Sequence, residues 1–285
     1  METPKTLLFE VREHVAHITL NRPEVSNAMN LEMSREFYEA AFECEQSSDV
    51  RAVLITGAGR AFCSGGDVKS FAAQEPSRLP AYYRRLTLFL HQAIHRFARM
   101  RAPVVMAVNG TAGGGGMSLA CAGDIVLASE SARFTMAYTQ IGLTPDGSST
   151  YYLPRIIGLR RTLELALTNR VLSAREAETM GLVTRVIPDD QLMAHAQTLV
   201  AELAKGPTRA YEGIKRLLYS ATNTPLAEQM EFETEWLTDM AGTADVQEGI
   251  AAFLAKRAPQ FNGHYAGSAV NLSGIRGMAW WSLTP

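Results

Sequence analysis

Hydrophobic and polar positions alternate with two different periods along this chain, and these periods predict its elements. Residues 7–20 favour two short strands with a turn near residues 12–14. A broad apolar face over residues 31–46 and a long amphipathic stretch over about 79–100 predict two helices. The runs AVLITG (52–57) and PVVMAVNG (103–110) are continuously apolar and end in glycine, so they predict buried parallel strands.

The same reading extends to the C-terminal half of the chain. DIVLAS and ARFTM continue the alternation of short apolar segments and helices, and residues 184–187 are expected to form a last strand. From about residue 189 the pattern is almost wholly helical, with breaks at 206–207 and 224–225. This order predicts an α/β fold with an α-helical C-terminal region. We expect a core over 1–205, a helical region over 206–262 and an irregular tail over 263–285.

Composition narrows the classes of protein. The 285 residues are 47% hydrophobic and 20% charged, as in an ordinary globular chain. A formal net charge of -2 provides no basic field for nucleic acid, and no apolar stretch has membrane-spanning length. Three widely spaced cysteines, Cys44, Cys63 and Cys121, argue against a disulfide framework or a zinc site. Without a signal-peptide pattern, we expect a reduced cytoplasmic protein that binds no nucleic acid, membrane or metal.

Two glycine clusters follow predicted strands, at residues 62–67 (FCSGGD) and 109–116 (NGTAGGGG). Glycine lets a ligand approach the backbone closely, and a helix that starts after each cluster offers free N–H groups. Two such junctions that converge would bind an oxyanion, although a tight turn explains either one alone. Neither cluster fits a P-loop or a clean G-x-G-x-x-G. GMSLA is one residue short of a nucleophile elbow at Ser118.

Four ordered motifs carry a resemblance to a known family: NRPEVSNAMN, RAFCSGGDVK, APVVMAVNGTAGGGGMSLACAGDI and RFTMAYTQIGLTPDGSSTYYLPRIIG. From about residue 7 to 261 the chain resembles the crotonase superfamily of enoyl-CoA hydratases and isomerases. The resemblance implies a spiral of ββα units and a C-terminal trimerisation region, hence a homotrimer or a hexamer. It also implies an acyl-CoA thioester substrate, and no cofactor beyond the coenzyme A that the substrate carries.

The resemblance assigns roles to the glycine loops. The thioester carbonyl would accept hydrogen bonds from the N–H groups of Gly66 and Gly115. The other substrate-binding positions that it implies in these loops are Ser64, Gly65, Asp67, Val68 and Gly114. Of these, Asp67 and Val68 would flank coenzyme A through their backbone. Lys256, in AFLAKRAP, is a candidate for the coenzyme A phosphates, although such a Lys-Arg pair is usually only a solvated surface.

The acid–base residues decide the reaction. The two glutamates that hydratases of this family use would fall at Ser118 and Tyr138, which disfavours hydration and leaves both as pocket residues. Asp146 lies in GLTPDG, which is also a common turn sequence. An aspartate there resembles the proton-transfer residue of ring-1,2-epoxyphenylacetyl-CoA isomerase-like and 3-enoyl-CoA isomerase members. We therefore favour an isomerase that shifts a double bond or rearranges a ring acyl-CoA.

Other reactions stay open. The stretch 138–170 also resembles 4-chlorobenzoyl-CoA dehalogenases, in which an aspartate aligned with Asp146 is the nucleophile and a histidine aligned with His91 assists water. Their aromatic cage is largely missing, so we interpret His91 as a helix residue at the pocket edge. Thioester hydrolysis through Asp146, hydration, and non-catalytic acyl-CoA binding are further alternatives. A serine hydrolase based on Ser118 is least favoured, because no paired histidine and acid accompany it.

Overall fold

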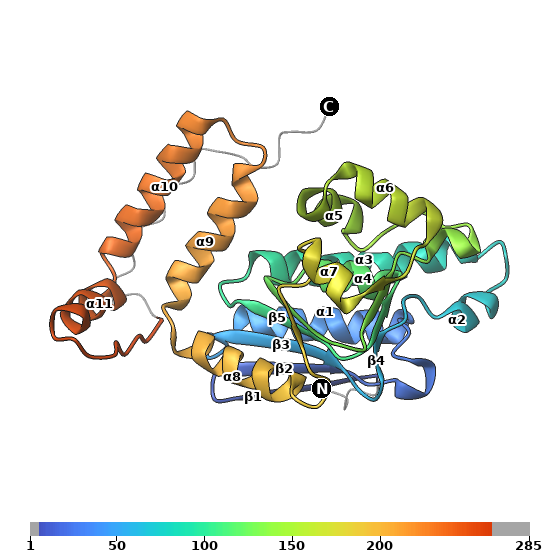
Figure 1. Cartoon of the computed structure of the whole chain (residues 1–285), viewed down its shortest axis with the longest axis horizontal. Helices are drawn as coiled ribbons and strands as arrows, with labels where there is room; N and C mark the ends of the chain where they lie inside the picture. The colour runs from blue at the N-terminus through green and yellow to red at the C-terminus, as the bar shows by residue number, and fades with distance from the viewer. Residues whose placement is uncertain (1–5, 264–285) are drawn as a thin grey trace.

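The computed structural model describes residues 6–263 and contains two β-sheets with helices around them (Figure 1). The larger sheet has six strands in the order β1-β2-β3-β5-β7-β10, and the smaller has four in the order β4-β6-β8-β9. The strands are β1 (Leu7–Arg12), β2 (Val15–Leu20), β3 (Ala52–Gly57), β4 (Ala61–Cys63), β5 (Val104–Val108), β6 (Thr111–Gly113), β7 (Ile125–Ser129), β8 (Arg133–Thr135), β9 (Leu172–Ser173) and β10 (Arg185–Ile187).

The first two strands form the predicted hairpin. Leu7 pairs with Leu20 and Arg12 with Val15 in antiparallel register. Glu13 and His14, the two turn residues, have φ values of 48° and 65°. Positive φ at both central residues is the geometry that a two-residue hairpin turn requires. From β2 onward every neighbouring pair in the larger sheet is parallel, and β3 and β5 are buried along their whole length, as their sequences predicted.

From β3 to β8, successive strands alternate between the two sheets. β3, β5 and β7 lie in the larger sheet, while β4, β6 and β8, which follow each of them in sequence, lie in the smaller one. The chain thus winds as a spiral whose turns each add one strand to both sheets. The helices are α1 (Leu31–Gln46), α2 (Val68–Ala72), α3 (Leu79–Arg99), α4 (Gly115–Cys121), α5 (Ser149–Ile157), α6 (Leu159–Thr168), α7 (Ala174–Thr179), α8 (Leu192–Lys205), α9 (Thr208–Ala221), α10 (Leu226–Ala241) and α11 (Ala244–Leu254), with the short 3-10 turns η1 (Pro23–Val25) and η2 (Tyr138–Ile141).

Two expectations about local structure need correction. No strand was expected between residues 57 and 103, yet residues 61–63 form β4, which is too short to show an alternating pattern. The C-terminal helices break a third time, between α10 and α11, where the Thr243 side chain accepts a hydrogen bond from Val246 N–H and caps α11. The two predicted breaks contain proline, whereas this one has only Gly242 as a signal.

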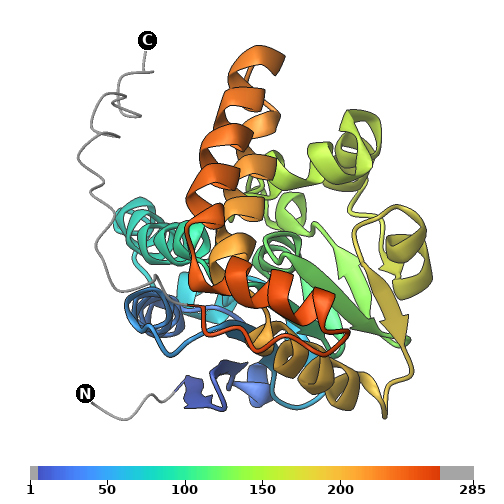
Figure 2. The same cartoon turned by 90° about the vertical axis from the view of Figure 1, so that its left-hand side faces the viewer.

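Helices α9 to α11 form an arm that extends away from the two sheets, as both views show (Figures 1 and 2). A buried ion pair joins the arm to the core, because Lys215 Nζ on α9 lies 2.7 Å from Asp124 Oδ2. The same ammonium group donates to the carbonyl oxygens of Phe97 and Ala102. Over residues 6–263, no helix is both long enough and apolar enough to cross a membrane. The predicted tail lies outside the described residues, except for Gly263.

Candidate active site

The two glycine loops meet because β4 and β6, the strands that precede them, are parallel neighbours. A Cβ atom on Gly65 would lie 2.8 Å from Gly113 O, and one on Gly116 would lie 2.0 Å from Cys63 O. The loops therefore pack backbone against backbone. Gly65 and Gly114 also have φ values of +104° and +47°, which side chains disfavour. The convergence expected from the sequence is present in the structure.

Outside the helices and strands of residues 6–263, neither the Gly66 N–H nor the Gly115 N–H donates to a backbone oxygen. The N–H groups of two neighbouring residues do have backbone partners, because Gly114 N–H donates to Thr135 O and Asp67 N–H donates to Met29 O. Gly66 is exposed, and Gly115 is buried at the start of α4. Unpaired N–H groups on facing loops can donate to a single ligand oxygen, which is the arrangement that stabilises an oxyanion.

Asp146 lies at the end of a chain of hydroxyl groups. The Tyr138 hydroxyl donates to Asp146 Oδ1 at 2.6 Å, and the Ser118 hydroxyl lies 2.8 Å from the Tyr138 oxygen. Burial, together with the charge of Asp146, raises the pKa of Tyr138, so the phenol stays protonated near neutral pH. The positions where hydratase glutamates would fall are thus adjacent in space and hold a neutral hydroxyl pair.

The turn at Asp146 is compatible with a role for its side chain. The backbone carbonyl of Asp146 accepts from Ser149 N–H and Ser149 Oγ, and Gly147 has φ +58°, so the residue does begin a tight turn. The carboxylate, in contrast, contacts Tyr138 and is 28% exposed. The backbone of Asp146 therefore forms the turn that the sequence predicts, and its side chain remains the candidate for proton transfer.

His91 belongs to the surroundings of this carboxylate. Its Nε2 lies 3.7 Å from Asp146 Oδ2 and accepts a hydrogen bond from Gly147 N–H at 3.2 Å. His91 lies on the predicted helix α3 with a half-exposed side chain, and it also contacts the loop that carries Asp146. Its place at the edge of a substrate pocket stays a prediction.

The glycine loops and the Asp146 network border each other. A Cβ on Gly115 would lie 3.9 Å from the Tyr138 hydroxyl, and one on Gly66 would lie 2.6 Å from the Phe71 ring. Phe71 in turn packs against Tyr83, with ring centroids 4.7 Å apart. Burial, and next the charge of Asp146, raises the pKa of Tyr83. This aromatic pair was not predicted, because residues 70–83 show no regular hydrophobic period.

Asp67 has a mainly structural environment. Its carboxylate lies 2.9 Å from Arg22 Nη2 and accepts from Ser70 N–H at the start of α2. Although burial opposes ionisation, these hydrogen bonds lower the pKa of Asp67 overall. The Asp67 N–H donates to Met29 O, and the expectation that the Asp67 backbone flanks coenzyme A stays a prediction. Val68 and Ser64 are exposed beside it, and their binding role stays a prediction.

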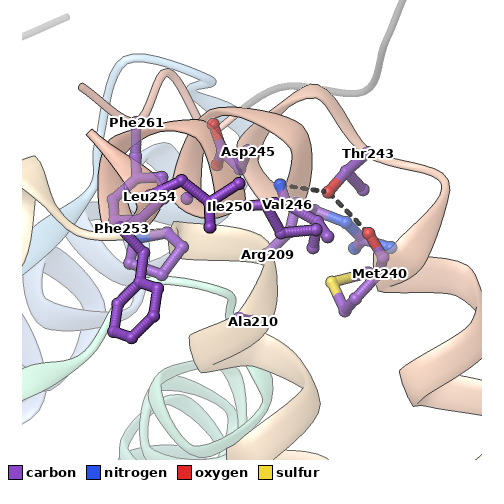
Figure 3. Close-up of a pocket in the computed structure, with 12 residues that line it drawn as sticks. Arg209, Ala210, Met240, Thr243, Asp245, Val246, Ile250, Phe253, Leu254 and Phe261 are labelled. Atoms are coloured by element: carbon purple, nitrogen blue, oxygen red, sulfur yellow. Dashed lines mark hydrogen bonds between the residues drawn. The ribbon is translucent and has the colours of Figure 1, made fainter. Parts of the chain in front are cut away.

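Lys256 lies apart from the other candidate residues. It follows α11, on the opposite side of the molecule from α2 (Figure 1). A pocket of about 410 Å³ lies in the same arm, lined mainly by apolar side chains of α9 to α11 (Figure 3). Its lining includes Met240, Ile250, Phe253 and Leu254, but none of the candidate site residues. Within this chain, then, Lys256 is remote from the glycine loops.

The three cysteines are buried and free, which is consistent with the predicted absence of a disulfide framework. Burial raises the pKa of each thiol to about 12. None is therefore an activated nucleophile, since such thiols need a depressed pKa and access to solvent. The chemistry of the site rests on its N–H groups, hydroxyls, imidazole and single carboxylate.

A spiral of paired strands, in which two packed glycine loops border the hydrogen-bonded network of one carboxylate, is an arrangement suited to thioester enolate chemistry. The Enoyl-CoA hydratase/isomerase family matches residues 10–264, and the chain belongs to that family. It is 39% identical over 257 residues to 1,2-epoxyphenylacetyl-CoA isomerase of Escherichia coli, covering 90% of this chain and 98% of the relative.

A second relative and a solved structure extend the comparison. The chain is 32% identical to 4-chlorobenzoyl coenzyme A dehalogenase-2 of an Arthrobacter species, over 87% of this chain and 90% of the relative. The crystal structure of enoyl-CoA hydratase from Bacillus anthracis superposes with a TM-score of 0.85 at 29% identity, covering 91% of this chain and 100% of the other. The crotonase fold and the resemblance stated from the sequence are confirmed.

Proposed function

We propose that this protein is an acyl-CoA isomerase in which Asp146 moves a proton and the N–H groups of Gly66 and Gly115 hold the thioester oxygen. Asp146 removes a proton from C2 of a 3-enoyl-CoA, and the electrons of that C–H bond enter a dienolate whose charge rests on the thioester oxygen. The same proton returns at C4, which re-forms the carbonyl and leaves the double bond between C2 and C3. The reaction neither adds nor removes water.

The observation that carries this proposal is the pairing of one carboxylate with two hydroxyls. Ser118 and Tyr138 hydrogen-bond to each other where a hydratase would need two carboxylates to activate water. A raised pKa prevents Tyr138 from acting as a base near neutral pH. Proton transfer within one substrate requires only a single carboxylate, and Asp146 provides it. The name of the Escherichia coli relative, 1,2-epoxyphenylacetyl-CoA isomerase, supports an isomerase and keeps a ring acyl-CoA beside a linear one as its substrate.

The surroundings of the site support an acyl-CoA substrate that needs no further cofactor. The Phe71 and Tyr83 rings form an apolar wall beside Gly66, where the acyl group would lie if its carbonyl met the two N–H groups. Coenzyme A enters as part of this substrate. We also propose that the enzyme acts in the cytoplasm as a homotrimer or a hexamer, so that Lys256 could serve the site of a neighbouring subunit.

The arm supports the proposed oligomer. Its helices expose large apolar side chains that a lone chain would leave in water. They include Ile214, Leu218, Leu226, Met230, Leu237, Ile250, Phe253 and Leu254. Contact with another subunit would bury this surface and the pocket shown in Figure 3.

The decisive variant is Asp146→Asn, which keeps the shape of the side chain and removes the base. We expect turnover of a 3-enoyl-CoA, followed as conjugation of its double bond, to fall at least about 1000-fold. Acyl-CoA binding, measured by calorimetry, should change little. Asp190→Asn, on an exposed residue outside the site, is the matched control and should be as active as the parent enzyme. Near-normal turnover by the Asp146 variant would rule out the mechanism.

Dehalogenation is a second candidate, favoured by the 3.7 Å approach of His91 Nε2 to Asp146 Oδ2. In that reaction the carboxylate would attack the ring carbon that carries chlorine, chloride would leave, and water would hydrolyse the aryl ester formed. Chloride release from 4-chlorobenzoyl-CoA distinguishes this reaction from isomerisation. A third assay, loss of the double bond of a 2-enoyl-CoA, tests for hydration. Binding with no turnover in all three assays would favour an acyl-CoA-binding role.

A further inference from the structure

The hydroxyl groups of Ser118 and Tyr138 form a buried hydrogen-bonded chain that ends on Asp146. Ser118 is completely buried and Tyr138 is 8% exposed. The oxygen–oxygen distances are 2.8 Å from Ser118 to Tyr138 and 2.6 Å from Tyr138 to Asp146 Oδ1. Both residues come from elements that the spiral brings together, α4 and η2, and neither has a part in the proton transfer itself.

The direction of the hydrogen bonds follows from counting hydrogens. An ionised carboxylate only accepts, so the single hydrogen of Tyr138 points to Asp146 Oδ1. Two hydroxyl oxygens 2.8 Å apart need a hydrogen between them, and that hydrogen must then come from Ser118. Gly114 O lies farther from Ser118 Oγ, at 3.2 Å, and is the weaker acceptor. Donation therefore runs from Ser118 to Tyr138 to Asp146.

We propose that Tyr138, oriented by Ser118, is a positioning residue that holds Asp146 Oδ1 and leaves Oδ2 to carry the substrate proton. This inference rests on the proposed isomerase function and deepens it. Removal of a proton at C2 and its return at C4 require one oxygen to face both carbons in turn. A carboxylate that is fixed through its other oxygen meets this requirement, because it does not populate unproductive rotamers.

The groups that face Asp146 determine the expected pH dependence. His91 and Tyr83 approach it from α3, and Tyr138 approaches from η2. Only Tyr138 donates a hydrogen bond to the carboxylate, among the residues that the structure describes. Because this bond favours the ionised form, its loss should make the carboxylate take up a proton at higher pH.

The test compares three variants that each remove one hydroxyl group. Tyr138→Phe keeps the buried ring and should lower kcat for a 3-enoyl-CoA about 10- to 100-fold. The acid limb of its kcat/KM profile should move up by about one pH unit, because a hydrogen bond to a charged group is lost. Acyl-CoA affinity should stay within about threefold. Ser118→Ala should shift kcat and the acid limb in the same directions but by smaller amounts, because Ser118 acts only through Tyr138.

Tyr151→Phe is the matched control, since that ring lies on α5 close in sequence but has no hydroxyl contact to Asp146 among residues 6–263. It should retain the kcat and the acid limb of the parent enzyme. An unchanged acid limb in Tyr138→Phe, or a change in affinity alone, overturns the positioning role. If Tyr138→Phe does not fold, as judged by thermal melting, the same two readouts in Ser118→Ala decide. Asp146→Asn separates the positioning role from the proposed isomerase function. If Asp146→Asn loses activity while Tyr138→Phe behaves like the parent enzyme, only the positioning role is refuted.

Discussion

Gly115 and Gly116 are adjacent residues with opposite steric demands. A Cβ on Gly115 would meet its nearest neighbour, the Tyr138 hydroxyl, at 3.9 Å, which is ordinary contact. A Cβ on Gly116 would lie 2.0 Å from Cys63 O, so the two loops would have to separate. Gly116 is thus needed for the packing of the loops, whereas Gly115 leaves space where the proposed thioester oxygen would bind.

Substitution at these two positions should separate function from stability. Gly115→Leu should leave a folded protein, because its Cβ meets its neighbours at ordinary contact distances, but should lower acyl-CoA turnover at least about tenfold by crowding the site. Gly116→Ala should lower the free energy of unfolding by about 1–3 kcal/mol, the usual cost of overpacking. Chemical denaturation and steady-state kinetics measure both effects. Equal stability losses in the two variants would contradict this division.

The residues of the site differ in how well the sequence predicted them. Glycine clusters at strand ends reveal a backbone constraint directly, so the two loops could be proposed from the chain alone, and the resemblance added the particular residues Gly66, Gly115 and Asp146. The contact between Tyr138 and Asp146 could not be foreseen, because it depends on the conformation of the turn around Gly147. Phe71 was missed for a related reason: α2 is only five residues long, too short for a hydrophobic period. Tyr83 lies on the predicted long helix α3, but the sequence gave no sign that its ring packs against Phe71.

At the scale of elements, α9 shows how the arm is attached to the core. Lys215 and Asp124 have side chains that are 8% and 16% exposed, and the carboxylate also accepts from Val104 N–H. A buried charge left without its partner is strongly destabilising, whereas an intact pair contributes little net stability. The sequence correctly predicted helix α9 but gave no sign that its lysine, Lys215, is buried.

Lys215→Met should therefore lower the free energy of unfolding by about 3–5 kcal/mol. The thioether replaces the alkyl stem but leaves Asp124 without its cation. Lys205→Met, on an exposed residue at the end of α8, is the control and should have almost no effect. Adding Asp124→Asn to Lys215→Met should recover part of the loss. A lysine variant as stable as the parent in urea would show that the pair does not anchor α9.

At the scale of the whole molecule, the arm exposes several large apolar side chains, and the proposed oligomer would bury them. The Phe253 side chain is 83% exposed although it lines the pocket in Figure 3. Leu237 and Leu254 are exposed to a similar degree on the neighbouring faces. Burial of such side chains is the main favourable term in subunit association.

Light scattering should therefore give a mass of three or six chains of 31.2 kDa each. Phe253→Asp should yield smaller species at micromolar concentration, because a carboxylate would have to be buried at the contact. Gln247→Asp adds the same charge to an exposed polar position of α11 and should leave the mass unchanged. If the parent protein is a monomer in this measurement, the proposed oligomer is wrong.

The larger sheet has one further property: its strand order, β1-β2-β3-β5-β7-β10, follows the order of the chain. No later strand inserts between two that are already paired, so the sheet can grow at one edge as the polypeptide leaves the ribosome, N-terminus first. β4 and β6 likewise precede residue 146. During synthesis, both glycine loops therefore leave the ribosome before the carboxylate that they would serve.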